Sequence, residues 1–289
     1  MTDTDDHPDR AASVPGGTGA DPLTAPLSYP GVPPWRPAVL VTGAEVLGLQ
    51  PLRDAPVGDW VMRTGAGPRP GAGDGQRRDV ALDQFLRSAG VSAVADRTAV
   101  LAVGSNASPA QVQRKMANAG LPTLVPITAV RVRGLAVGVS AHVSRPGYLP
   151  ATPVPDPAAV SGLWVVWLDT AALTAMDATE PNYQRVRLSS RHAVQLTPGQ
   201  PVAPCWVYRS RHGYLLNAAG TPRRLTDQAT LITALLAEIP ALQPLAGTSP
   251  PDWIERTRNP GVRDAIRHLF RAAGLVRRPA GLEGSLGGL

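Results

Sequence analysis

Cysteine and lysine are almost absent from this 289-residue sequence. The one cysteine, Cys205, excludes an internal disulfide and a cysteine-rich zinc site. It lies in the apolar run Pro-Cys-Trp-Val-Tyr, which predicts a buried, unreactive thiol. Lys115 is the only lysine among 28 basic residues, and this excess of arginine is typical of the codon usage of a GC-rich genome. The arginines are spread along the chain, so the net charge of +6 does not predict a nucleic-acid partner.

Long apolar runs are also lacking. No stretch approaches the roughly 20 apolar residues of a membrane-spanning helix, so we expect no membrane partner. The first ten residues are acidic and polar, whereas a signal peptide has a basic start and an apolar core. We therefore expect a cytoplasmic protein. Four histidines lie in separate segments of the expected folded domain, without the spacing of metal ligands, and therefore predict no metal site. They are His142, His192, His212 and His268.

Composition divides the chain into four parts. Residues 1–30 combine Gly, Pro, Asp and Thr without periodicity, which predicts a disordered tail. Residues 31–79 form an N-terminal extension, with a short apolar run that predicts a docked strand or hairpin, and a Gly-rich linker. We expect the folded domain to span residues 80–276, and the Gly-rich residues 277–289 to form a second disordered tail.

The expected domain is rich in strands, with helices inserted and appended. Capping residues and apolar spacing predict helices at 81–90, 108–120, 169–180, 226–239 and 260–274. Apolar runs predict strands at 98–103, 123–143, 162–168, 185–196 and 201–210. Because helices and strands do not alternate regularly, the pattern favours an α+β fold with a mixed, partly closed β-barrel over a doubly wound sheet.

The turn Gly104-Ser105-Asn106 is the first candidate site. It follows a buried strand and leads into a helix with Ser108 as its predicted N-cap and Pro109 at its first position. Such a turn leaves backbone N–H groups unpaired, and these attract an anion or a developing negative charge. An ordinary strand-to-helix turn is the alternative interpretation.

Glu180 is the second candidate. It ends a short helix, is followed at once by Pro181, and precedes a strand that begins near Tyr183. A carboxylate in this position can point into a cavity enclosed by the strands and exchange protons there. The alternative is a surface ion pair with Arg185 or Arg187.

The order of these motifs resembles the gamma-glutamylcyclotransferase-like superfamily. That family has a Tyr-Gly-Ser-Asn turn after its first barrel strand, where this chain reads Val-Gly-Ser-Asn at 103–106. It then has a Gly-x-x-Trp strand, a helix ending Leu-Asp-x-x-Glu and a tyrosine, which match Gly162 to Trp167, Met176 to Glu180, and Tyr183. The resemblance covers residues 98–209.

The resemblance implies cyclisation of a γ-glutamyl small molecule with release of 5-oxoproline and no cofactor. Glu180 would be the general acid/base, and backbone N–H groups of the turn would hold the oxyanion. Substrate binding is expected at Val103, Gly104, Ser105, Asn106 and Tyr183. We add Arg185 to these residues because its planar pair of donors suits a substrate carboxylate.

Two questions stay open. Val103 replaces the aromatic residue of the family motif, so a non-catalytic barrel that binds a small molecule or a partner is the alternative function. The amine half of the substrate is also undefined, since a peptide, a polyamine or a natural-product intermediate fits the motifs equally well.

Overall fold

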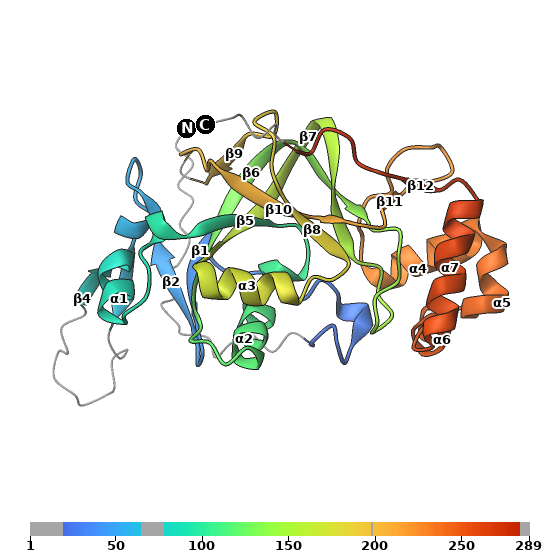
Figure 1. Ribbon diagram of the computed structural model, residues 1–289, viewed down its shortest axis with the longest axis horizontal. Helices are drawn as coiled ribbons and strands as arrows, with labels where there is room; N and C mark the ends of the chain where they lie inside the picture. The colour runs from blue at the N-terminus through green and yellow to red at the C-terminus, as the bar shows by residue number, and fades with distance from the viewer. Residues whose placement is uncertain (1–19, 65–77, 198, 284–289) are drawn as a thin grey trace, which may run out of the picture.

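The computed structural model describes residues 20–64, 78–197 and 199–283. Most of the predicted N-terminal tail and of the linker, and the last six residues, therefore lie outside the described residues. A large, mostly antiparallel sheet forms the centre of the α+β fold, and helices lie below it and at one end (Figure 1).

The central sheet has ten strands. Its order is β4-β3-β2-β1-β6-β7-β5-β10-β8, with β9 also paired to β6. All pairs are antiparallel except β5 with β10. The strands are β1 Ala38–Thr42, β2 Val46–Gln50, β3 Val61–Thr64, β4 Arg78–Ala81, β5 Thr98–Ala102, β6 Leu124–Val139, β7 Ala151–Leu168, β8 Tyr183–Arg187, β9 Val194–Leu196 and β10 Cys205–Ser210. A separate two-stranded sheet pairs β11 Tyr214–Leu215 with β12 Val276–Arg277.

The sheet does not close, which corrects the expectation of a partly closed barrel. Among the described residues the series of paired strands ends at β4 and at β8, and these two strands do not pair with each other. The edge of β6 opposite β7 pairs with β1 over Leu124–Thr128 and with β9 over Val130–Val132. The N-terminal hairpin therefore extends the sheet, and the described residues 31–64 belong to the central fold.

Strand β7 is longer than the sequence predicts. The sequence predicts a strand only at 162–168, but β7 pairs with β6 from Ala151 onward, through a segment that contains several prolines. Pro153, Pro155 and Pro157 occupy alternate positions, so their missing N–H groups all face one edge. The intervening residues supply the hydrogen bonds to β6, and the strand continues through the prolines.

Seven α-helices are present in the described residues: α1 Leu82–Ser88, α2 Pro109–Asn118, α3 Thr170–Ala178, α4 Gln228–Glu238, α5 Gln243–Ala246, α6 Pro250–Arg256 and α7 Pro260–Ala272. Local signals place their ends as expected: Asp169 caps α3 by accepting a hydrogen bond from the Ala172 N–H, and Gly120 follows α2 with φ +67°. No single described helix is long and apolar enough to cross a membrane, although α4 with Pro240–Ala246, a pair bent by 107°, reaches that length and composition.

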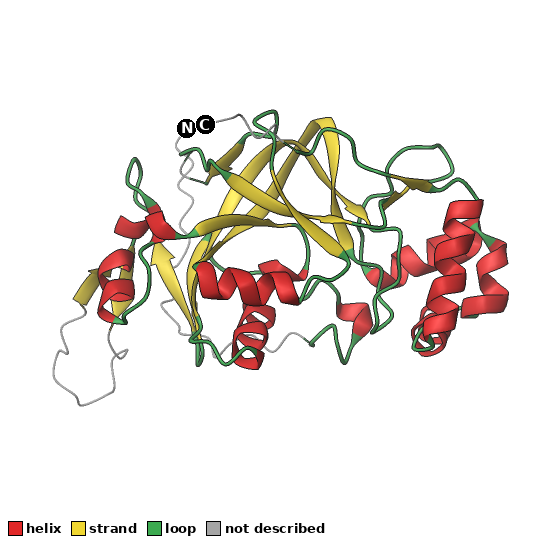
Figure 2. Cartoon of the chain, viewed as in Figure 1, coloured by secondary structure: helices red, strands yellow, loops and turns green. Residues whose placement is uncertain are grey.

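Helices α2 and α3 cover one face of the sheet. Alternate residues of its strands point to opposite faces, so Val100 and Val166 pack with Met116 of α2 and Met176 of α3. The opposite face belongs to the main core around Leu101. Helices α4 to α7 form a separate cluster at one end of the molecule, with its own apolar core (Figure 2).

The chain ends differ from the expected disordered tails. Residues 20–30 are placed, and Tyr29 is buried with 5% of its surface exposed. Leu282 has no exposed surface and packs in the main core. Composition suggested disorder because these segments are rich in Gly and Pro, but one apolar residue in each segment contacts a part of the chain far away in sequence.

Candidate active site

The turn after β5 lines a cavity of about 270 Å³. Gly104 leads into a short 3-10 helix, Ser105–Ala107, and α2 begins immediately afterwards. A Cβ on Gly104 would overlap the Tyr29 hydroxyl and lie 3.1 Å from the Ala151 Cβ. Glycine is therefore needed here because another side chain approaches the backbone closely.

Glu180 lines the same cavity. It follows the end of α3, and its backbone carbonyl accepts a hydrogen bond from the Tyr183 N–H at 3.0 Å. Its side chain is 14% exposed. The Asn106 Nδ2 donates to Glu180 Oε1 at 3.1 Å, so the structure brings the two candidate motifs together.

Lys115 completes this cluster, and the sequence analysis assigned it no role. It comes from α2, and its side chain is 7% exposed. Its ammonium donates to Glu180 Oε1 and to Asn106 Oδ1, each at 2.7 Å, and contacts Met176 Sδ at 3.4 Å. The available signal was that this residue is the only lysine in an arginine-rich chain.

The two oxygens of Glu180 differ. Both side-chain donors, Asn106 Nδ2 and Lys115 Nζ, bind Oε1. Within residues 20–64, 78–197 and 199–283, no donor binds Oε2. One oxygen therefore fixes the orientation of the carboxylate while the other is free to exchange a proton.

Four tyrosines line the cavity, and three of them, Tyr29, Tyr148 and Tyr183, lie around Ala151 or stack on one another. The rings of Tyr29 and Tyr148 stack with centroids 4.2 Å apart. Tyr183 donates its hydroxyl to the Ala151 carbonyl at 2.8 Å, while the Tyr29 hydroxyl accepts from the Ala151 N–H at 2.9 Å. Burial raises the pKa of all three, that of Tyr148 to about 12, so these hydroxyls stay protonated near neutral pH. Tyr29 was missed because it lies in the segment expected to be disordered.

Arg185 does not reach the cavity. Its Nε donates to Asp177 Oδ1 at 3.0 Å and one terminal nitrogen donates to Oδ2 at 3.0 Å. Its guanidinium also lies 4.9 Å from the centre of the Trp206 ring. The planar donor pair that the sequence suggested for a substrate carboxylate is bound to Asp177 in this structure. The alternative interpretation, a surface pair of Glu180 with Arg185 or Arg187, is not formed among the described residues, where Glu180 pairs with Lys115.

The cavity walls carry more positive than negative charge. Arg114, Lys115 and Arg145 line it, and Glu180 is the one carboxylate among the lining residues. Arg114 lies 3.6 Å from Asp21 Oδ2. Arg145 is exposed and makes no ion pair within the described ranges. This arrangement favours a ligand with a carboxylate at the Arg145 side.

His142 lies deeper in the wall. Its Nδ1 is 2.6 Å from the Ser140 Oγ, and burial lowers its pKa to about 3, which keeps the ring neutral. In the part of the chain that the structure describes, no three His, Cys, Asp or Glu side chains are placed to hold a metal ion.

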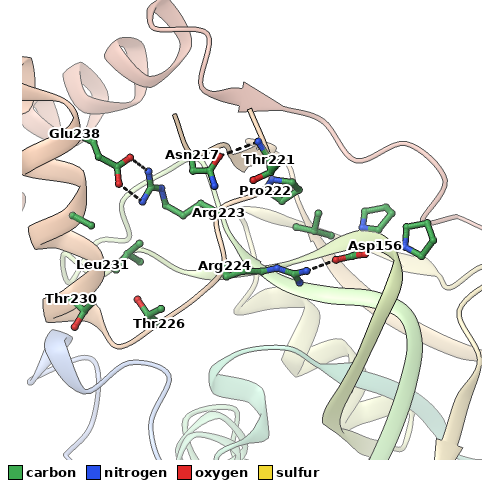
Figure 3. Close-up of a pocket in the computed structure, with 14 residues that line it drawn as sticks. Asp156, Asn217, Thr221, Pro222, Arg223, Arg224, Thr226, Thr230, Leu231 and Glu238 are labelled. Carbon is green, nitrogen blue, oxygen red and sulfur yellow. Dashed lines mark hydrogen bonds and ion pairs between the residues drawn. The ribbon is translucent and has the colours of Figure 1, made fainter. Parts of the chain in front are cut away.

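A second, larger cavity of about 680 Å³ lies between β7 and α4 (Figure 3). Its charged side chains are paired across the walls, Arg223 with Glu238 and Arg224 with Asp156. None of the candidate residues from the sequence lines it. The Glu180 cavity is therefore the better candidate for chemistry.

Comparison with known proteins does not assign a family. No family model matches the sequence, and no curated protein matches it. Among the solved structures that match is one named "Gamma-glutamyl cyclotransferase", with a TM-score of 0.35 and 11% identity, over 60% of this chain and 99% of that one. At this level of likeness, the function has to be inferred from the residues of the cavity.

Proposed function

We propose that this protein is an intramolecular acyltransferase that cyclises a γ-glutamyl amine, releasing 5-oxoproline and the free amine. The observation that carries the proposal is the position of Glu180, which shares one cavity with the turn at Gly104–Asn106. Its Oε1 is fixed by Lys115 and Asn106, and its Oε2 faces no described donor. A single oriented carboxylate beside a polar turn is the minimum that this reaction requires.

The reaction balances with one proton-carrying group. The α-amine nitrogen attacks the γ-carbonyl carbon while Glu180 Oε2 accepts an amine proton, and a C–N bond closes the five-membered ring. Negative charge develops on the former carbonyl oxygen. The intermediate then collapses, the bond from the γ-carbon to the leaving nitrogen breaks, and Glu180 returns its proton to that nitrogen.

Ring closure suits a small, enclosed cavity. Both reacting groups belong to the same molecule, so the protein has only to hold a folded conformation in which nitrogen and carbonyl carbon approach each other. Oriented intramolecular reactions reach effective molarities of about 10⁵–10⁸ M, which reduces the catalysis that side chains must supply. Chemistry of this kind uses no redox partner.

Arg145 is the cation available for the substrate carboxylate. Lys115 uses its ammonium on Glu180, Asn106 and Met176. Arg145 lines the same cavity, is exposed, and has no ion-pair partner in residues 20–64, 78–197 and 199–283. A carboxylate bound there would anchor the γ-glutamyl group while its amine reaches Glu180 Oε2.

The proposal is tested by incubating the purified chain with a panel of γ-glutamyl amines and measuring 5-oxoproline by mass spectrometry. The panel covers γ-glutamyl amino acids, γ-glutamyl polyamines and ε-(γ-glutamyl)lysine. Release from at least one compound is expected, with the Arg145→Gln variant showing a higher KM. A chain that binds members of the panel without releasing 5-oxoproline would be the non-catalytic binding protein instead.

A further inference from the structure

The Tyr29 hydroxyl lies against the backbone of Gly104, and Tyr29 lines the cavity that holds Glu180. Tyr29 belongs to residues 20–31, which run below the sheet beside α2 (Figure 1). Its hydroxyl oxygen is so close to Gly104 that a Cβ there would overlap it. The same hydroxyl accepts a hydrogen bond from the Ala151 N–H at 2.9 Å. The phenol is therefore held between the turn and the start of β7.

The Tyr29 hydroxyl accepts a hydrogen bond, but its own proton is not donated to any acceptor in the described residues. The Ala151 N–H donates to the oxygen at 2.9 Å. In the described ranges, no acceptor binds the Tyr29 O–H. Because Tyr29 lines the cavity, this donor is available to a bound molecule. Accepting a bond from a backbone N–H group also polarises the O–H and strengthens it as a donor.

The hydroxyl keeps its proton throughout the physiological range. Burial raises the pKa of Tyr29 far above its usual value, and the neighbouring Tyr148 and Glu180 act in the same direction. A group that donates a hydrogen bond without losing its proton is suited to stabilising an oxyanion.

We propose that Tyr29 is a catalytic residue of the cyclisation, donating the hydrogen bond that stabilises the oxyanion of the tetrahedral intermediate. The inference rests on the proposed function. It also changes the role of the turn, since the close approach of Gly104 to the Tyr29 hydroxyl makes the turn a support for the phenol. Glu180 then serves the nitrogen side of the intermediate and Tyr29 serves the oxygen side.

The segment that carries Tyr29 is fixed to the site at two further points. Asp21 Oδ1 accepts a hydrogen bond from Gln111 Nε2 of α2 at 2.9 Å, and Asp21 lies 3.6 Å from Arg114. The Tyr29 ring stacks on Tyr148 with an angle of 14° between the planes. These contacts limit the movement of the phenol and so meet the requirement that an oxyanion donor be preorganised.

The test compares Tyr29→Phe with Tyr214→Phe in the full chain. Tyr29→Phe keeps the ring that stacks on Tyr148 and removes only the hydroxyl. Tyr214 is a buried tyrosine that does not line the cavity, so its variant is the matched control. Steady-state release of 5-oxoproline gives kcat and KM, and circular dichroism checks the fold. Hydrogen exchange followed by NMR reports the Ala151 N–H independently of turnover.

We expect Tyr29→Phe to lower kcat by about 10²–10³-fold while KM changes by less than about threefold, because the lost bond is made mainly in the transition state. The Ala151 N–H loses its acceptor and exchanges faster, whereas Tyr214→Phe resembles the wild type in both measurements. A second variant with 4-aminophenylalanine at position 29 restores an N–H donor. Its kcat is expected to be at least about tenfold higher than that of Tyr29→Phe.

The outcomes separate the two proposals. An active wild type with an equally active Tyr29→Phe variant would overturn the role of Tyr29 alone. An active 4-aminophenylalanine variant that turns over no faster than Tyr29→Phe would do the same. A wild type that releases no 5-oxoproline from any γ-glutamyl amine would overturn the proposed function and this inference with it.

Discussion

The Lys115 ammonium lies 2.7 Å from Glu180 Oε1, and both side chains are largely buried, with 7% and 14% of their surfaces exposed. The pair joins α2 to the end of α3 at the rim of the cavity. It fixes one carboxylate oxygen and leaves the other free. The position of the one lysine in the chain is therefore tied to the proposed base.

Removing Lys115 is expected to lower the stability of the fold. Lys115→Met leaves Glu180 as an uncompensated charge, which costs about 3–5 kcal/mol for a buried pair. Urea unfolding measures this loss. The control is the double variant Lys115→Met with Glu180→Gln, which removes both charges and is expected to regain most of the lost stability. If the single and the double variant lost the same free energy of unfolding, the charge of Glu180 would not depend on Lys115 for its stabilisation.

The same lysine offers a direct spectroscopic test. Because Lys115 is the only lysine, labelling with lysine carrying ¹⁵N at Nζ gives a single side-chain ammonium signal. We expect a signal protected from solvent exchange in the wild type and a shifted, less protected one in Glu180→Gln. A rapidly exchanging ammonium in the wild type would contradict the ion pair.

Gly104 and Tyr29 are expected to be coupled. Gly104→Ala places a methyl group against the Tyr29 hydroxyl, and overpacking of this kind costs about 1–3 kcal/mol. In the Tyr29→Phe background the clash is relieved, so the second substitution costs less. Unfolding of the two single variants and the double variant measures this coupling, and simple additivity would argue against the close approach.

Arg185 is expected to matter for stability and not for substrate binding. Arg185→Gln breaks the hydrogen bonds to Asp177. Burial raises the pKa of Asp177, but the hydrogen bonds from Arg185 and Tyr208 outweigh burial and lower it. We expect a small loss of stability and an unchanged KM. An increase in KM of about tenfold or more, with the fold intact, would restore the role suggested by the sequence.

Cys205 should behave as an inert thiol. Burial raises its pKa from 9.0 to about 12, so the nucleophilic thiolate is rare at neutral pH. Since the folded state binds this proton more tightly, its contribution to stability is full below pH 9 and is lost as the pH rises toward 12. A maleimide reagent should label the native chain far more slowly than the chain unfolded in urea.

Local signals in the sequence predicted local structure. Asp169 and Pro109 mark helix starts, and Gly90 and Gly120 follow helix ends, because capping depends on residues within one turn. Glu180 and the turn at 104–106 were singled out in the sequence because each combines a special backbone position with a reactive or polar side chain, and the structure places them in one cavity.

Contacts between distant segments were not predictable in the same way. The second edge of β6 pairs with β1 and β9, which lie far from β6 in the sequence, and no local pattern encodes that choice. Tyr29 is buried through a contact with Ala151, 122 residues away, while its own neighbours are rich in Gly and Pro. The sequence showed Lys115 only as the single lysine of the chain. Its ion pair with Glu180 could not be predicted, because Glu180 lies 65 residues further along the chain.

The most direct test of the central claim is single-turnover release of 5-oxoproline by the wild type and by Glu180→Gln. The variant keeps the shape of the side chain and its hydrogen bonding with Lys115, but it cannot take up a proton. The account predicts an intact fold and a rate about 10²–10⁴-fold lower than that of the wild type. A Glu180→Gln variant that releases 5-oxoproline at the wild-type rate would contradict the assignment of Glu180 as the acid/base residue.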